Sequence, residues 1–292
     1  MDEQDLLAER FESHRRPLRA VAYRMLGSLG EAEDAVQETW LRLRRTDVSG
    51  VENLAAWLRT VVSRVCLDML RARTARREEP VGQRVPDRAG GEAGGPEDEA
   101  LLAESVGRAL LVVLDTLAPA ERVAFVLHDA FAVPFDEIAP IVERSPVTTK
   151  KLASRARHKV RGTPAVPAAD LARQRHVVSA FLAASRGGDL EALLAVLAPD
   201  VVRRADRAAL PPGVATTVWG ARTVAREITV LGRRSRFAEV ALVDGAVGLV
   251  VAPRGRLRLA LTFRVAGGRV EEYEVVADPA RLGALRVGVL DG

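Results

Sequence analysis

The chain has 292 residues, 48% hydrophobic and 28% charged, which suits a soluble globular protein of two or three domains. Its 43 Lys and Arg against 39 Asp and Glu give a formal net charge of +4. One cysteine, Cys66, excludes an intrachain disulfide, and four scattered histidines predict no metal site. The acidic N-terminus and the lack of an apolar run near ~20 residues predict no signal peptide, no membrane span and a cytoplasmic location.

Residues 2–78 are predicted to be wholly helical. The segment from Gly27 to Gly30 ends a first helix, and a second helix covers residues 31–45 with a buried apolar stripe at three- and four-residue spacing. Its exposed side gathers acidic and amide groups, at Glu33, Asp34, Gln37 and Glu38. Such a cluster is either an ordinary solvated face or a docking surface for a basic partner helix.

A third helix, over residues 54–77, becomes basic toward its C-terminal end. Cations there are favourable because of the helix dipole, which accounts for Arg76 and Arg77. Arg64 lies mid-helix and escapes that explanation. From residue 78 to residue 104 acids, glycines and prolines dominate, which predicts a flexible acidic linker.

A helix-turn-helix is predicted between residues 134 and 161. A helix over residues 135–142 leads through a turn at residues 143–145 into a second helix, with Ser145 as N-cap and Pro146 at its first position. Pro140 should either kink the first helix or delay its start. The second helix turns Thr149, Leu152, Ala156 and Val160 inward, and its six Lys and Arg with no acid favour a reader of the DNA major groove over a merely exposed basic helix.

Beyond residue 167 the pattern becomes that of an α+β domain. Helices are predicted over residues 171–185, 189–197 and 220–231, and strands over residues 201–202, 237–243, 246–251, 257–265 and 269–276. Asp244-Gly245 and Gly267-Gly268 fit two-residue hairpin turns. We expect an antiparallel meander with one solvated face, curled around the helices.

The two helical blocks resemble the extracytoplasmic function (ECF) sigma factors of bacterial RNA polymerase. The resemblance is carried by EDAVQETWLRL at residues 33–43, AWLRTVVSRVCLDMLR at residues 56–71, LAPAERVAFVLHDAFAVPFDEIA at residues 117–139 and SRARHKVR at residues 154–161. It implies a sigma region 2 domain (1–79), an acidic linker (80–100) and a sigma region 4 helix-turn-helix domain (101–163). It also implies two partners, core RNA polymerase and promoter DNA.

The last third, with GDLEALLAVLAPDVV at residues 188–202, resembles the cone-shaped SnoaL-like fold. A hinge (164–170) followed by a SnoaL-like regulatory domain (171–292) is the arrangement of the SigJ-like subgroup. That subgroup carries a Trp-Leu-Pro-Glu-Pro type linker motif and an Asn-Pro-Asp-Lys-Leu terminal motif that support domain docking. Both motifs are altered in this chain. The residues that stand at the motif positions, and to which the resemblance assigns the interdomain contacts, are Val85, Pro86, Asp278, Pro279 and Arg281.

The resemblance also assigns partners to single residues. It assigns contact with the β′ clamp helices of the polymerase to Asp34, Gln37 and Glu38. It also implies a contact between this chain and the β flap of the polymerase. The −10 promoter element falls to Ser63, Arg64, Asp68 and Arg71. The −35 element falls to Lys150, Lys151, Ser154, Arg155 and Arg157. Many ECF factors have Asn where Arg64 stands, so the preferred −10 base stays open.

The main hypothesis is therefore a promoter-specificity subunit regulated in cis by its C-terminal domain, with no enzymatic activity, no catalytic residues and no cofactor. One alternative makes that domain an enzyme, with candidate acid or base groups at Glu271, Glu272, Tyr273, Glu274, Asp206 and His176. Another is a ligand-responsive DNA-binding regulator. Residues 31–78 argue against it, because such a regulator has no need of a helical block beside its helix-turn-helix. A separate anti-sigma factor and a small-molecule ligand in the cone are left open.

Overall fold

The computed structural model describes residues 3–47, 50–78 and 106–290. The chain divides into two compact units, Met1–Leu102 with Leu114–Arg157, and Ala103–Val113 with His158–Gly292. The expected linker over residues 80–100 lies outside the described residues.

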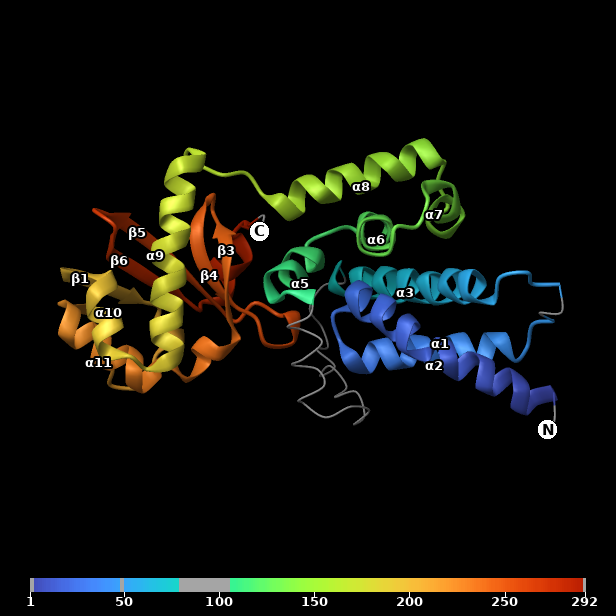
Figure 1. The fold of residues 1–292 in the computed structure, drawn as a ribbon, viewed down its shortest axis with the longest axis horizontal. Coiled ribbons are helices and arrows are strands. Elements are labelled where there is room, and N and C mark those ends of the chain that lie inside the picture. Colours follow the sequence, from blue (N-terminus) through green and yellow to red (C-terminus); the bar gives the residue numbers. More distant parts are fainter. Residues whose placement is uncertain (1–2, 48–49, 79–105, 291–292) are drawn as a thin grey trace. The chain divides into compact units, whose positions relative to one another are not determined.

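The first unit begins with three helices packed along one another, α1 (Glu3–Leu26), α2 (Leu29–Leu43) and α3 (Leu54–Glu78) (Figure 1). Ser28 is the N-cap of α2, and its hydroxyl accepts a hydrogen bond from the Glu31 N–H. Gly27 has a φ of +75°, so the break that ends α1 falls at the residue type that tolerates this conformation. The three predicted helices are present, and the described residues between the second and the third, 44–47 and 50–53, form turns and irregular structure instead of helix.

The helix-turn-helix has the predicted bounds. After α6 (Pro119–Phe125) and a π-helical turn at Val126–Ala130 come α7 (Phe135–Val142) and α8 (Pro146–Arg161). Glu143 ends α7 in the left-handed conformation, and the Ser145 hydroxyl accepts from the Thr148 N–H. Of the two outcomes expected at Pro140, a kink or a late helix start, the late start is excluded: α7 runs through Pro140, and the buried side chains of Ile138 and Ile141 stabilise the helix on either side of it.

The second unit is a sheet covered by helices. The helices are α5 (Arg108–Asp115, which continues past the unit boundary), α9 (Ala168–Gly187), α10 (Leu190–Val196), α11 (Ala221–Leu231) and α12 (Pro279–Ala284). The strands are β1 (Leu197–Ala205), β2 (Thr217–Trp219), β3 (Ala238–Val243), β4 (Ala246–Val251), β5 (Leu259–Ala266), β6 (Arg269–Val276) and β7 (Val287–Gly288). Single 3-10 turns lie at Arg207–Ala209, Gly232–Phe237 and Pro253–Gly255.

The strand order is β2-β1-β6-β5-β4-β3-β7. Strands β3 to β6 form the expected antiparallel meander, and β1 joins the sheet by a parallel pairing with β6 that the sequence analysis does not predict. The sequence could not reveal this, because β1 and β6 are separated by most of the domain. The short edge strands β2 and β7 were also not anticipated.

Both predicted hairpin turns are present. Val243 pairs with Ala246 across Asp244 and Gly245, which have φ values of 48° and 84°. A Cβ on Gly245 would lie 2.6 Å from the Cβ of Ala165, so only glycine fits this close approach.

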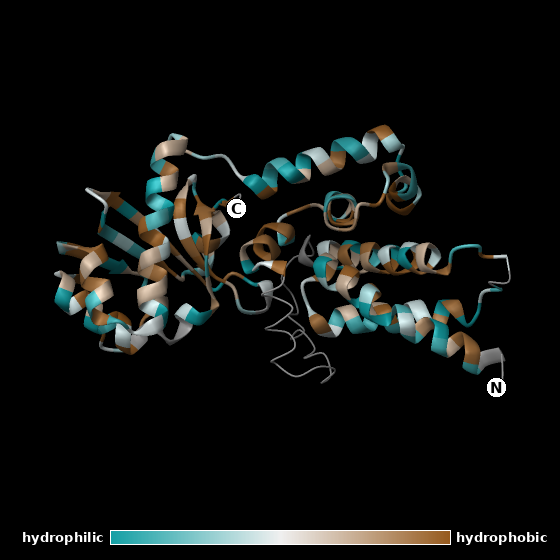
Figure 2. Cartoon of the chain, in the orientation of Figure 1, coloured by the Kyte–Doolittle hydropathy of each residue, from teal (hydrophilic) through white to brown (hydrophobic). Residues whose placement is uncertain are grey.

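One face of the sheet packs on α9, α10 and α11 through a core that includes Phe181, Leu193 and Val224 (Figure 1). On β3 and β4 a second apolar cluster joins Ala241, Val243 and Val250 to Ala109 of α5. The solvated face that the sequence predicts is therefore partly covered. Figure 2 shows the difference in residue hydropathy, with hydrophobic colour on β3 and β4 and much hydrophilic colour along α8.

Candidate functional site

The predicted docking face on α2 is exposed. Asp34 and Gln37 are exposed, and Glu38 is half-buried with its carboxylate 2.9 Å from Nε of Arg42. Glu33 instead faces α1 and pairs with Arg19 at 3.1 Å. One helix therefore presents two carboxylates and an amide to solvent, a surface that fits a basic partner.

The basic residues of α3 contact α7 of the same unit. Arg59 pairs with Glu137 at 3.0 Å, and Arg71 pairs with Glu143 at 3.1 Å. Arg64 donates to the Pro140 carbonyl at 3.3 Å. These side chains, two of which carry predicted −10 roles, therefore already have protein partners.

Ser63 lies differently from its predicted neighbours. It is fully buried, and its hydroxyl donates to the Arg59 carbonyl at 2.7 Å, so it presents no group to a DNA surface in this structure. Asp68 is exposed, as a surface role requires. A signal was present in the sequence, because Ser63 precedes Cys66, Leu67 and Leu70 at the three-, four- and seven-residue spacing of one apolar helix face.

A buried cation lies beneath the basic face. Arg122 of α6 is 2% exposed, and its guanidinium lies 3.4 Å from the Asp115 carboxylate. Burial lowers the pKa of Arg122 to about 10, although Asp115 acts in the opposite direction. Arg73 of α3 pairs with the same carboxylate at 3.6 Å and with Glu31 at 2.5 Å. Arg73 and Arg122 therefore stabilise the unit rather than extend its basic surface.

The basic side of α8 is available to a partner. Thr149, Ala156 and Val160 are buried as predicted, Leu152 is half-buried and Ala153 completes the inward face. The side chains predicted to read DNA are exposed, at Lys150, Lys151, Ser154 and Arg155. Arg157 is the exception, because its Nε donates to the Asp129 carboxylate at 2.6 Å.

The predicted interdomain residues that the structure describes act within the second unit. Asp278 caps α12 by accepting from the backbone N–H groups of Ala280 and Arg281. Pro279 occupies the first position of α12, and Arg281 bridges Asp206 and Glu274 at 2.5 and 2.9 Å. Val85 and Pro86 lie outside the described residues.

The carboxylates considered as catalytic bases are held in ion pairs. Burial alone would raise the pKa of Asp206, but the N–H groups of Asp278 and Ala277 and the Arg281 guanidinium outweigh it and lower that pKa. A hydrogen bond from Arg204 lowers the pKa of Glu272. Glu271 lies 3.3 Å from Arg264, and His176 is exposed. The lowered pKa values of Asp206 and Glu272 are the opposite of the raised value that a carboxylate base working near neutral pH needs.

Within the described ranges, no group of three or more potential ligand residues is placed to hold a metal ion. In the same ranges no helix is long and apolar enough to cross a membrane.

Comparison with known proteins identifies the family of this chain. Residues 10–76 match the Sigma-70 region 2 model, and residues 107–160 match the Sigma-70 region 4 model. The chain is 40% identical to the ECF RNA polymerase sigma factor SigJ of Mycobacterium tuberculosis, over 83% of this chain and 80% of the relative. The chain belongs to the ECF RNA polymerase sigma factors.

Two further similarities extend over nearly the whole sigma factor. It is 34% identical to the probable ECF sigma factor SigI of M. tuberculosis, over 98% of each chain. The crystal structure of M. tuberculosis SigJ is 33% identical, covers 94% of this chain and 98% of that one, and superposes with a TM-score of 0.45. The region 2 match also argues against a plain repressor, since it spans α2 and α3.

The sequence reasoning missed a pair of charged residues in this sigma factor. Arg203 of β1, which is buried, and Glu227 of α11, which is half-buried, form an ion pair inside the second unit. A signal was present, because residue 203 shares its strand parity with the buried Val201 and Ala205 and so had to point inward.

Proposed function

We propose that this sigma factor directs core RNA polymerase to promoters through three surfaces of its helical unit. The observation that carries the proposal is the exposed polar face of α2, which lies in a segment matching sigma region 2. Asp34, Gln37 and Glu38 would contact the basic clamp helices of the β′ subunit. The β flap would be contacted by the region 4 part of the chain.

The test is direct binding of the full-length chain to purified core RNA polymerase. Asp34→Lys should weaken binding at least tenfold at low salt, because it places a cation against a basic surface. Glu12→Lys on α1 is a matched control, since Glu12 is also exposed but lies outside the polar face. Equal losses in both variants, or no binding of the unmodified chain, would exclude this role.

The promoter contacts are assigned to α3 and α8. Arg64, Asp68 and Arg71 would meet the −10 element, with Ser63 buried beneath them as a support. Lys150, Lys151, Ser154 and Arg155 would meet the −35 element in the major groove, and Arg157 would hold α8 against Asp129 as well as approach the backbone phosphates. Run-off transcription on genomic fragments, followed by mapping of start sites, identifies the promoters.

The free chain would need to open before α3 could bind DNA. This step is supported by the three contacts that α3 makes with α7, because they occupy Arg59, Arg64 and Arg71. A chain in which the basic face is covered would bind promoter DNA only after the contacts break.

The C-terminal domain would set this equilibrium. The Glu239 carboxylate accepts from the backbone N–H groups of Arg108 and Ala109 at 2.5 and 3.2 Å, which holds the start of α5. The Val289 N–H donates to the Val160 carbonyl at 2.7 Å, at the end of α8. Both contacts lie within the second unit, at the residues where the segment that matches region 4 begins and ends.

Regulation in cis can be tested with Glu239→Gln in the full-length chain. The variant weakens two charge-assisted hydrogen bonds and should change the rate of run-off transcription from a mapped promoter at least twofold. Glu191→Gln, on the exposed side of α10, is the control of equal charge. An unchanged rate with Glu239→Gln would exclude control through α5.

A further inference from the structure

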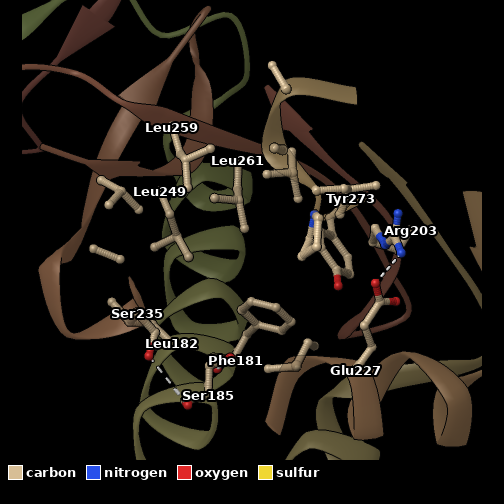
Figure 3. A pocket seen from close by; sticks show the side chains of 18 residues that line it. Phe181, Leu182, Ser185, Arg203, Glu227, Ser235, Leu249, Leu259, Leu261 and Tyr273 are labelled. Carbon is tan, nitrogen blue, oxygen red and sulfur yellow. Dashed lines mark hydrogen bonds and ion pairs between the residues drawn. The ribbon is translucent and has the colours of Figure 1, made fainter. Parts of the chain in front are cut away.

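The second unit contains a cavity that the sigma-factor activity does not use. It lies between α9, α11 and the concave face of the sheet, with a volume of about 420 Å³ (Figure 3). That volume falls within the ~300–1,000 Å³ of small-molecule sites. Its walls are mostly apolar, among them Leu182, Leu249, Val251, Leu259, Leu261 and Val275.

One end of the cavity carries the charged pair. Arg203 is 3% exposed at its side chain, and it pairs with the Glu227 carboxylate, which is 18% exposed. The other terminal nitrogen of Arg203 donates to the Ala215 carbonyl at 2.8 Å. The cation is therefore already neutralised, and a ligand carboxylate would add a third, unbalanced charge to an apolar space.

The third polar feature is a tyrosine hydroxyl. Tyr273 is 5% exposed, and its ring is held by Phe181 and Phe263 at centroid distances of 5.4 and 5.8 Å. Figure 3 shows its hydroxyl pointing into the cavity, near the charged pair. Across the described residues, no hydrogen bond is recorded for this hydroxyl. The hydroxyl faces the cavity, so a ligand with a carbonyl or hydroxyl group placed there can form a hydrogen bond that the described protein residues do not make.

We propose that this cavity is a binding site for an uncharged, largely hydrocarbon small molecule with a carbonyl or hydroxyl group that hydrogen-bonds to Tyr273. The apolar walls take up the hydrocarbon part, and the neutral Arg203–Glu227 pair disfavours an anion. The site lies wholly within the second unit and does not depend on the polymerase or promoter contacts proposed above.

The probe is N-phenyl-1-naphthylamine, an uncharged dye that fluoresces in apolar sites, added to the full-length chain. It should bind at a single site, and its sulfonated analogue, 1-anilinonaphthalene-8-sulfonate, should bind that site at least tenfold more weakly. Decan-2-one should displace the dye at a concentration at least tenfold below that of decanoate. Equal displacement by the ketone and the carboxylate, or no dye binding, would overturn the proposal.

Two kinds of variant locate the site. Tyr273→Phe should leave dye affinity within about twofold and weaken decan-2-one about fivefold, the usual effect of one neutral hydrogen bond. Leu261→Trp fills the cavity and should abolish dye binding. Ala209→Phe, on the exposed 3-10 turn at the cavity wall, blocks it with less risk to the fold.

Each variant is first checked by circular dichroism and thermal melting. Dye binding that survives in folded Ala209→Phe and Leu261→Trp would place the dye elsewhere and refute the cavity. An unchanged ketone affinity in Tyr273→Phe would refute the role of the hydroxyl.

Discussion

Breaking the contacts between α3 and α7 should increase the affinity of the free chain for DNA. The proposed change is Glu137→Gln together with Glu143→Gln, which removes the carboxylates that pair with Arg59 and Arg71. Both substitutions keep the size of the side chain, and both carboxylates are more than half exposed, so the fold should be retained.

The expected magnitude follows from that exposure. Ion pairs between partly exposed side chains contribute about 0.2–1 kcal/mol each, so two of them amount to roughly 1 kcal/mol. This corresponds to about a fivefold rise in the fraction of chains with an uncovered α3, and an equal fall in the apparent Kd for DNA. The Arg64 hydrogen bond to the Pro140 carbonyl remains and sets an upper limit on the gain.

The assay is fluorescence anisotropy with a labelled single-stranded 12-mer of mixed sequence at ~0.05 M salt, where ion pairs are weakly screened. Removing any acid makes the chain more basic, so the control is Glu12→Gln with Glu191→Gln, two exposed acids away from α3. Adding Arg71→Ala to the test variant should remove most of the gain. If test and control variants bind DNA equally well, the covered basic face has no effect on DNA binding and the reasoning is wrong.

Three further results are expected. If Lys151 neutralises a phosphate beside the major groove, Lys151→Ala should reduce the slope of log K against log salt by about 0.9 for promoter DNA, and an unchanged slope would exclude that phosphate contact. Asp206→Asn should lower the Tm of the C-terminal domain near neutral pH. The difference in Tm between the variant and the unmodified chain should vanish as pH falls below about 3.8, because the folded pKa of this carboxyl is lowered and its contribution is lost on protonation. A pH-independent difference would contradict that ion-pair role. Asp115→Asn should lower the free energy of unfolding in urea by about 1–3 kcal/mol, because the charge of the buried Arg122 is then less compensated. This is below the ~3–5 kcal/mol of a fully buried pair, since Asp115 is 38% exposed. A decrease under ~0.5 kcal/mol would show that other groups neutralise Arg122.

Local chemistry accounts for the predictions that the structure confirms. The start of α8 follows from Ser145 and Pro146, and the hairpin turns follow from Asp244-Gly245 and Gly267-Gly268, because capping and positive φ values depend on neighbouring residues. The late helix start at Pro140 is excluded for a reason that depends on the whole fold. Burial of the neighbouring isoleucines offsets the lost hydrogen bond, and burial is a property of the folded chain.

The sequence by itself determined the helical blocks, the helix-turn-helix, the order of the strands β3 to β6 and the family resemblance, because short-range periodicity and motif spacing encode them. Only the tertiary structure decided which polar side chains face a partner and which are already paired. Arg64, for example, donates to the carbonyl of Pro140, a residue 76 positions away in the chain. The parallel pairing of β1 with β6 and the cavity at Tyr273 depend on contacts between distant residues, which no local pattern specifies.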